Sequence, residues 1–137
     1  MSGLDDLFTA AKAMQAKAYA PYSRFKVGAA IRSPGGRIHA GCNVENAAYP
    51  QGACAETGAI SAMIAAGESR IAEILVIGDG EHLVTPCGGC RQRIREFASP
   101  ETPIHIAGPQ GLRRSFTLED LLPHSFGPDH LAATRDA

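Results

Sequence analysis

Three cysteines and one glutamate have the residue types and spacings that suit metal chemistry. Cys87 and Cys90 form a C-x-x-C pair in "TPCGGCRQRI", between a proline and a basic amphipathic segment. Cys54 stands two residues before Glu56 in "CAETGAISAMIAAG". A C-x-x-C pair alone is compatible with a redox pair, half of a structural zinc site or part of a catalytic metal site. The positions of the other possible ligands in the sequence must decide among these three kinds of site.

The sequence positions of the three cysteines and the glutamate favour a catalytic metal site. Cys54, Cys87 and Cys90 fall at or near predicted helix starts, where partial positive charge and free N–H groups favour thiolate over thiol. Three thiolates directed at one point would bind Zn²⁺ and leave the fourth tetrahedral position for water. Glu56 beside such a site could take a proton from that water and pass it to a leaving group. The pattern predicts one Zn²⁺ per chain, with Glu56 as the catalytic proton shuttle.

Three other interpretations stay open at this point. The C-x-x-C pair could be a thioredoxin-like redox motif, although it follows the third predicted strand rather than the first. A structural zinc site could take Cys42 as a fourth ligand, but strand alternation puts Asn43 and Glu45 on one side and Cys42 on the other. A non-catalytic, zinc-stabilised interaction module would have no use for Glu56.

Hydrophobic periodicity predicts the elements that would position these residues. A first amphipathic helix runs from Leu4 to Ala18 and is ended by Pro21. The following elements are a hairpin of "FKVGAAIRS" and "RIHAGCNVE", the helix "CAETGAISAMIAAG", the strand "EILVIGD", the helix "GGCRQRIREFAS", the strands "PIHIAG" and "RRSFTL", the short helix "LEDLL" and a tail containing Pro and Gly. Only Gly108 to Gly111 separate the last two strands, too few for a parallel crossover. We therefore expect an α/β fold: a three-layer α/β/α sandwich with a central mixed five-stranded sheet whose last two strands are antiparallel, in a single domain over residues 1–137.

Composition excludes several classes of partner. The chain has 45% hydrophobic and 20% charged residues and a formal net charge of −1, so nothing attracts it generally to nucleic acid or to an anionic membrane. No apolar run approaches the roughly 20 residues of a membrane span. The acidic start "MSGLDDLF" lacks the features of a secretory signal. We expect a cytoplasmic protein whose cysteines are reduced thiols or metal ligands.

Five motifs, in order along the chain, identify a family. They are "YAPYSRFKVGAA", "GCNVENAAYP", "GACAE", "PCGGCRQ" and "LLPHSFGP". Together they resemble the zinc-dependent cytidine deaminases of the small homotetrameric, three-cysteine type, and the resemblance covers nearly the whole chain. It implies hydrolytic deamination of free cytidine and deoxycytidine to uridine and deoxyuridine, with release of ammonia, as in pyrimidine salvage. It also implies a homotetramer whose sites are shared between subunits.

The same resemblance implies the residues that bind the nucleoside. Asn43 and Glu45 would hydrogen-bond the ribose 3′-hydroxyl, and the Ala55 backbone N–H would meet the base O2. Phe25 would line the pyrimidine pocket. The remaining expected contacts, at a junction between subunits, are Phe126 and Tyr49. Two alternative substrates are less favoured. The near-neutral charge and the lack of an aromatic-basic strip disfavour nucleic acid. The motif "NVEN", which suits an unmodified ribose, disfavours another aminopyrimidine nucleoside.

One position departs from the family pattern. Many relatives carry an arginine directly after the catalytic glutamate, and this chain has Thr57 there. Three thiolates on Zn²⁺ leave a net negative charge, which opposes ionisation of the bound water. Besides the two helix N-termini, Arg91 beside Cys90 is the expected compensating cation, and the Thr57 hydroxyl could donate to a thiolate.

Overall fold

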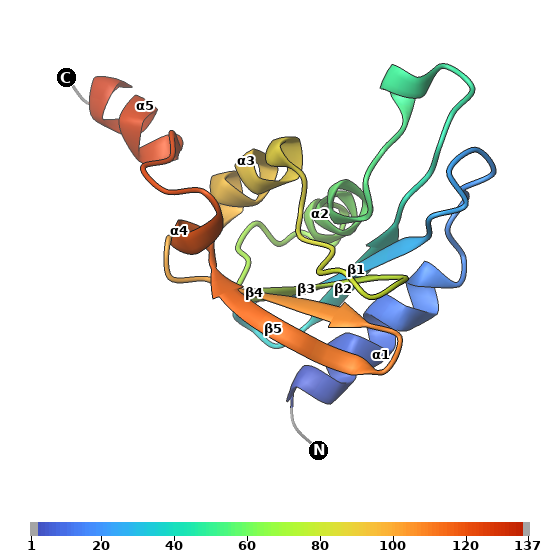
Figure 1. Cartoon of the computed structure of the whole chain (residues 1–137). Helices are drawn as coiled ribbons and strands as arrows, with labels where there is room; N and C mark the ends of the chain where they lie inside the picture. Colours follow the sequence, from blue (N-terminus) through green and yellow to red (C-terminus); the bar gives the residue numbers. More distant parts are fainter. Residues whose placement is uncertain (1–2, 136–137) are drawn as a thin grey trace.

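One five-stranded sheet organises the chain, of which the computed structural model describes residues 3–135 (Figure 1). Its strands are β1 (Val27–Arg32), β2 (Ile38–Cys42), β3 (Glu73–Gly78), β4 (Pro103–Gly108) and β5 (Gly111–Thr117). They lie in the order β2-β1-β3-β4-β5. β3 and β4 are parallel, and the other neighbours, including β4 and β5, are antiparallel. The predicted mixed sheet with antiparallel last strands is confirmed.

Helices cover both faces of this sheet. The helices of the described chain are α1 (Gly3–Gln15), α2 (Ala55–Ala65), α3 (Gly88–Phe97), α4 (Leu118–Leu121) and α5 (Pro128–Arg135), together with a short 3₁₀ helix, η1 (Tyr49–Gln51). α5 and η1 project away from the sheet (Figure 1). Figure 1 shows α1 on one face of the sheet and α2 and α3 on the other. The predicted three-layer arrangement is confirmed. No helix among the described residues is both long and apolar enough to cross a membrane.

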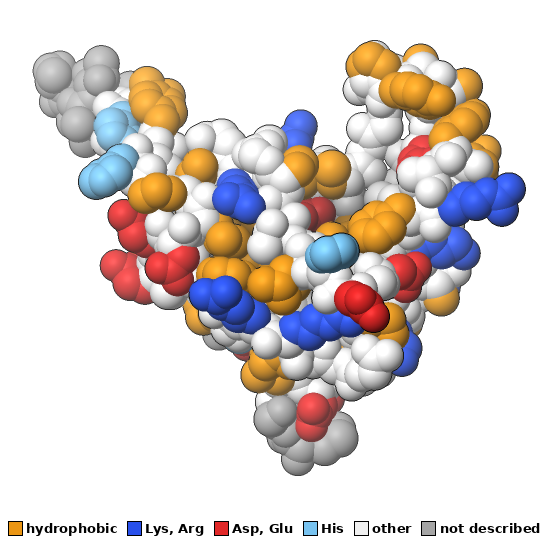
Figure 2. All heavy atoms as spheres, viewed as in Figure 1, with side chains coloured by type: hydrophobic (Ala, Val, Ile, Leu, Met, Phe, Trp, Pro, Cys, Tyr) orange, Lys and Arg blue, Asp and Glu red, His pale blue; other side chains and the backbone are white. Residues whose placement is uncertain are grey.

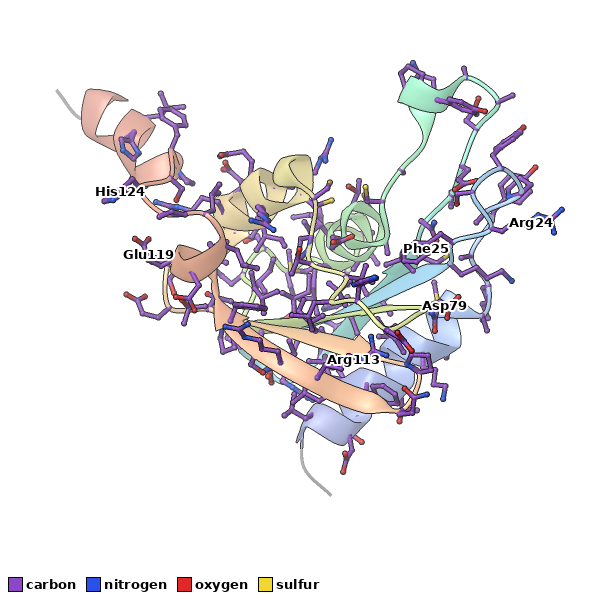
Figure 3. All side chains as sticks on the ribbon, in the orientation of Figure 1. Arg24, Phe25, Asp79, Arg113, Glu119 and His124 are labelled. Carbon is purple, nitrogen blue, oxygen red and sulfur yellow. The ribbon has the colours of Figure 1, made fainter. Side chains whose placement is uncertain are left out.

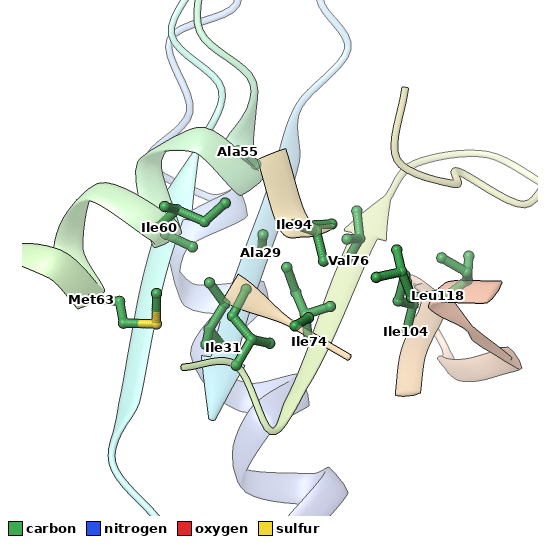
Figure 4. Close-up of a cluster of buried hydrophobic side chains, with 14 residues drawn as sticks. Ala29, Ile31, Ala55, Ile60, Met63, Ile74, Val76, Ile94, Ile104 and Leu118 are labelled. Carbon is green, nitrogen blue, oxygen red and sulfur yellow. The ribbon is translucent and has the colours of Figure 1, made fainter. Parts of the chain in front are cut away.

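Alternation along β3 produces two hydrophobic cores. Ile74 and Val76 pack into the cluster beneath α2 and α3 (Figure 4), and Leu75 and Ile77 pack into the cluster beneath α1. All four side chains are buried because both faces of the strand are covered. This explains why "EILVIGD" is almost wholly apolar. The central strand therefore packs against α1 on one face and against α2 and α3 on the other.

Two glycines allow helices to approach the sheet closely. A Cβ atom on Gly41 of β2 would lie 2.6 Å from the carbonyl carbon of Gly58 and 2.8 Å from the carbonyl oxygen of Ala55, both in α2. A Cβ atom on Gly28 of β1 would lie 2.8 Å from the backbone nitrogen of Gln15 in α1. α2, which follows Cys54 and contains Glu56, therefore rests directly on the backbone of β2.

Two boundaries differ from the sequence-based expectation. α1 ends at Gln15 rather than continuing to Ala18. The chain becomes extended because Tyr19 pairs with the 43–45 segment: its N–H donates to Asn43 O at 3.0 Å, and its carbonyl accepts from Glu45 N at 2.8 Å. The expected tail also contains a helix, α5, which begins at a proline, the residue best suited to a first helical position. The outermost residues of the predicted domain, 1, 2, 136 and 137, lie outside the described part of the chain.

Candidate active site

The three cysteines meet where α2 and α3 begin. Cys54 directly precedes α2, Cys87 directly precedes α3, and Cys90 lies in the first turn of α3. Their sulfur atoms all lie within 4.8 Å of one another, and Cys54 Sγ is 3.8 Å from Cys87 Sγ. Figure 3 shows yellow sulfur atoms between α2 and α3. Cys42, at the end of β2, is not in this cluster. The fold thus brings together the three predicted cysteines and leaves the fourth out.

The chemistry and spacing of this donor set fit Zn²⁺. A tetrahedral site with Zn–S bonds of about 2.3 Å places its sulfurs about 3.8 Å apart. Burial raises the pKa of the Cys90 thiol far above its ordinary value, and it raises the pKa of Cys54 as well. Burial acts the same way on Cys87, but the Cys90 backbone N–H and the neighbouring thiols together lower its pKa. A bound cation is what would keep three such sulfurs deprotonated together.

Glu56 lies beside the cluster, in the first turn of α2. Its side chain is buried, with the residue only 4% exposed. Burial raises the pKa of this carboxyl, while its own backbone N–H, the Cys90 thiol and the Arg93 charge partly oppose the shift. A carboxyl with a raised pKa exchanges its proton closer to neutral pH than an ordinary glutamate does. Ala55 is the buried first residue of α2. As at any helix start, its backbone N–H has no acceptor within the helix and can donate to a ligand.

Asn43 and Glu45 bind the loop that leads into β1. The Asn43 side-chain amide donates to Phe25 O at 2.8 Å, and its oxygen accepts from Val27 N at 2.9 Å. The Glu45 carboxylate accepts from the N–H and the hydroxyl of Ser23. The hydrogen bond from the Ser23 hydroxyl is the main reason why the pKa of Glu45 lies below its usual value. The carboxyl is therefore ionised at neutral pH and accepts hydrogen bonds.

Glu45 also lines a groove next to this loop. The groove has a volume of about 360 Å³ and is lined by Tyr22, Ser23, Glu45, Asn46, Tyr49 and Gly52. Tyr49 belongs to a projecting arm, residues 44–53, which carries η1 and is closed at its base by the pairing of Val44 with Ala53. The groove lies between this arm and the loop that contains Tyr22 and Ser23. A separate, wider hollow on the surface lies between the arm and the α3 side of the molecule (Figure 2). Two of the predicted substrate residues, Glu45 and Tyr49, therefore face one groove.

Comparison with known proteins identifies the family of this site. The family described as "Cytidine and deoxycytidylate deaminase zinc-binding region" matches residues 1–106, which span the cysteine cluster and Glu56. The chain belongs to this deaminase family. As a member of a deaminase family it is an enzyme. Its three-cysteine cluster lies within the segment that matches the family's zinc-binding region.

Individual deaminases resemble the chain over most of its length. The cytidine deaminase of Sporosarcina psychrophila is 36% identical over 129 residues, covering 94% of this chain and 95% of that protein. The crystal structure of cytidine deaminase from Burkholderia pseudomallei has 43% identity and a TM-score of 0.86, covering 92% of this chain and all of the other. That from Mycobacterium tuberculosis has 38% identity and a TM-score of 0.77, covering 90% and 96%. The fold of this chain is therefore the deaminase fold.

The three aromatic residues expected at the deaminase substrate site are exposed in the single chain. Phe25, which precedes β1 (Figure 3), is 41% exposed, Tyr49 is 76% exposed and Phe126 is 56% exposed. The Phe126 ring stacks on that of His130, with centroids 5.0 Å apart, and its carbonyl accepts from the Gln92 side chain at 2.9 Å. Each of these rings is thus partly or largely open to solvent in the single chain.

The arginine expected to balance the thiolate charge points elsewhere. Arg91 donates to Pro86 O at 2.7 Å, to Leu121 O at 2.8 Å and to Thr85 Oγ1 at 3.1 Å. Its guanidinium thus ties the segment before Cys87 to the end of α4. A charge-tuning role for Arg91 stays a prediction, but the geometry favours a role in holding this segment.

The residue that sequence reasoning missed is Arg93. Its Nη1 lies 3.9 Å from Cys90 Sγ, and the Thr57 hydroxyl lies 3.9 Å from the same sulfur. The expected contact of Thr57 with a cluster sulfur is therefore present, and its electrostatic effect stays a prediction. Arg93 stands three residues after Cys90, which is the spacing of neighbours on one helix face, and this spacing is the signal that could have found it.

Proposed function

We propose that this chain catalyses zinc-dependent hydrolytic deamination of free cytidine and deoxycytidine to uridine and deoxyuridine, releasing ammonia, as a pyrimidine salvage enzyme. The observation that carries the proposal is the meeting of three cysteine sulfurs with the buried Glu56 at the start of α2. A cysteine set would suffice for a structural metal. A buried carboxyl with a raised pKa beside it is what hydrolysis needs in addition.

Cys54, Cys87 and Cys90 would hold the metal. When bound, Zn²⁺ supplies a Lewis acid that lowers the pKa of water toward neutrality. Glu56 takes the proton of the attacking water and places it on the cytosine N3, which makes C4 electrophilic. After hydroxide has added to C4, Glu56 carries the proton of the new C4 hydroxyl to the exocyclic amine. The C4–N4 bond then breaks, which releases ammonia and leaves the C4 carbonyl of uridine. One water is consumed, and the Glu56 carboxylate is regenerated.

The first turn of α2 and the 43–45 segment would orient the nucleoside. The Ala55 N–H, at a helix start, suits the base O2 because it has no acceptor within the helix. Asn43 and Glu45 would bind the ribose 3′-hydroxyl, the first as donor or acceptor and the second as acceptor. The lowered pKa of Glu45 supports this, because the carboxyl stays ionised at neutral pH. Phe25 would lie against the pyrimidine.

The complete site would form in a homotetramer. Tyr49 and Phe126 are large aromatic residues that stay exposed in the single chain, which supports their burial against neighbouring subunits. Phe126 would then cover the base in another subunit's site. The substrate is a free nucleoside, since a chain with a net charge of −1 has no general attraction for nucleic acid.

The proposal is tested by the loss of cytidine absorbance on addition of the purified, zinc-loaded protein. We expect stoichiometric formation of uridine and ammonia, and no reaction with a cytidine-containing oligonucleotide. Glu56→Gln is the matched control: it should keep its zinc and lose several orders of magnitude in kcat, because the amide cannot carry the proton. Deamination of the oligonucleotide in preference to cytidine, or near-normal turnover by Glu56→Gln, would contradict the proposal.

A further inference from the structure

The Arg93 side chain lies over the first turn of α3. Its Nη1 is 3.9 Å from Cys90 Sγ. A Cβ atom added to Gly89, four residues earlier on the same helix, would lie 3.0 Å from this Nη1 and 3.9 Å from the guanidinium carbon. A Cβ atom on the neighbouring Gly88 would meet nothing within 4 Å. A side chain at position 89 would therefore press on the guanidinium and force it to shift from its place beside Cys90.

The place of this guanidinium matters because the proposed metal site is rich in negative charge. Three thiolates exceed the charge of one Zn²⁺ by one unit, and Glu56 adds a carboxyl beside them. Cys90 is fully buried, so its charge is poorly screened by water. The two other arginines of α3 are engaged elsewhere: Arg91 with backbone carbonyls and Arg95 with Ser125 and Asp129.

We propose that Arg93 is a positioning residue of the metal centre, and that Gly89 is required for its action. A hydrogen bond from the guanidinium to the Cys90 thiolate stabilises the three-thiolate, zinc-loaded state, and a residue without a side chain at 89 leaves room for it. The inference rests on the proposed zinc site. In this chain, where Thr57 follows Glu56, the compensating cation comes from α3 rather than from α2.

The test measures the apparent zinc Kd by competition with a chromophoric chelator at fixed pH. Removing the charge in Arg93→Met should weaken zinc binding about tenfold, equivalent to about 1.4 kcal/mol. Arg93→Lys should recover a substantial part of the loss, since it keeps the charge. Arg95→Met, which removes an equal charge from the same helix away from Cys90, should bind zinc as the wild type does. Equal zinc affinity in Arg93→Met and wild type, or an equal loss in Arg95→Met, would overturn the proposal.

A second pair of variants tests the role of Gly89 without removing the charge. Gly89→Val should weaken zinc binding by about the same factor as Arg93→Met, because a β-branched side chain displaces the guanidinium. Gly88→Val, the matched control, should leave the affinity unchanged. In the double variant Gly89→Val/Arg93→Met the losses should not add, since both act through one contact. Full additivity, or equal effects of the two glycine substitutions, would contradict the assignment.

The outcome for the wild type separates this inference from the proposed function. A wild-type chain that binds no stoichiometric zinc would overturn the proposed function, and the Arg93 assignment with it. A wild type that binds zinc and deaminates cytidine, alongside an Arg93→Met variant of unchanged zinc affinity, would overturn the Arg93 assignment alone.

Discussion

Gly41→Ala should lower the deaminase activity because it disturbs the packing of α2, which carries Glu56, on β2. Gly41 points at the backbone of α2, where a methyl group would lie 2.6 Å from the carbonyl carbon of Gly58 and 2.8 Å from Ala55 O. These are backbone atoms within a helix, so no side-chain rotation can relieve the clash. α2 must move away from the sheet, and it takes Glu56 and the helix start with it.

The required movement sets the expected magnitude. Ordinary van der Waals contact begins at 3.4 Å, so α2 would have to rise by about 0.5–1 Å, and overpacking of this kind costs about 1–3 kcal/mol of folding free energy. A displacement of about 1 Å in a catalytic group can lower the rate about 100-fold. We therefore expect kcat/KM for cytidine to fall by about two orders of magnitude per folded, zinc-loaded molecule.

Gly28→Ala is the matched control for this prediction. It places a methyl group against Ala11 O and 2.8 Å from Gln15 N, both in α1, on the opposite face of the sheet from the cysteines. Urea unfolding should show that both variants are destabilised, Gly28→Ala at least as much as Gly41→Ala, because its methyl group meets the closer backbone atom. Steady-state deamination, normalised to zinc content and folded fraction, should fall steeply only in Gly41→Ala. Equal activity in the two variants would refute the reasoning that close packing of α2 on β2 positions the site.

Two further predictions concern the ligands and the assembly. Replacing any one of the three cluster cysteines by alanine should abolish tight zinc binding and activity, whereas Cys42→Ala should keep both; elemental analysis showing zinc lost from the Cys42 variant would favour a four-cysteine structural site. Phe126→Ala should raise KM for cytidine strongly with zinc content unchanged, because the base loses its cover from a neighbouring subunit. An unchanged KM for the tetrameric Phe126→Ala protein would count against a shared site.

Local patterns in the sequence were enough to predict much of the fold. The all-apolar "EILVIGD" predicted a strand covered on both faces, which β3 is, because a buried strand needs apolar residues at every position. The short connection after Gly108 predicted the antiparallel pairing of β4 and β5, because so few residues cannot form a crossover. Strand alternation likewise separated Cys42 from the cluster of the other three cysteines.

Features that depend on distant segments were decided only by the tertiary structure. The end of α1 is set by the pairing of Tyr19 with the 43–45 segment, which competes with the helix that local periodicity favours. α5 docks through an ion pair of 2.8 Å between Arg95 and Asp129, 34 residues apart, which no local pattern indicates.

The tertiary structure also decided which arginine side chain of α3 reaches the Cys90 sulfur. Sequence adjacency favoured Arg91 as the neighbour of Cys90, but successive residues on a helix point about 100° apart. Arg91 therefore turns to Pro86 and Leu121, while Arg93 reaches the Cys90 sulfur across the space left by Gly89. The sequence by itself determined which residue types meet at the cysteine cluster, since these follow from motif spacing and element order. Which charge stands beside the sulfurs depended on the packed geometry of one helix turn.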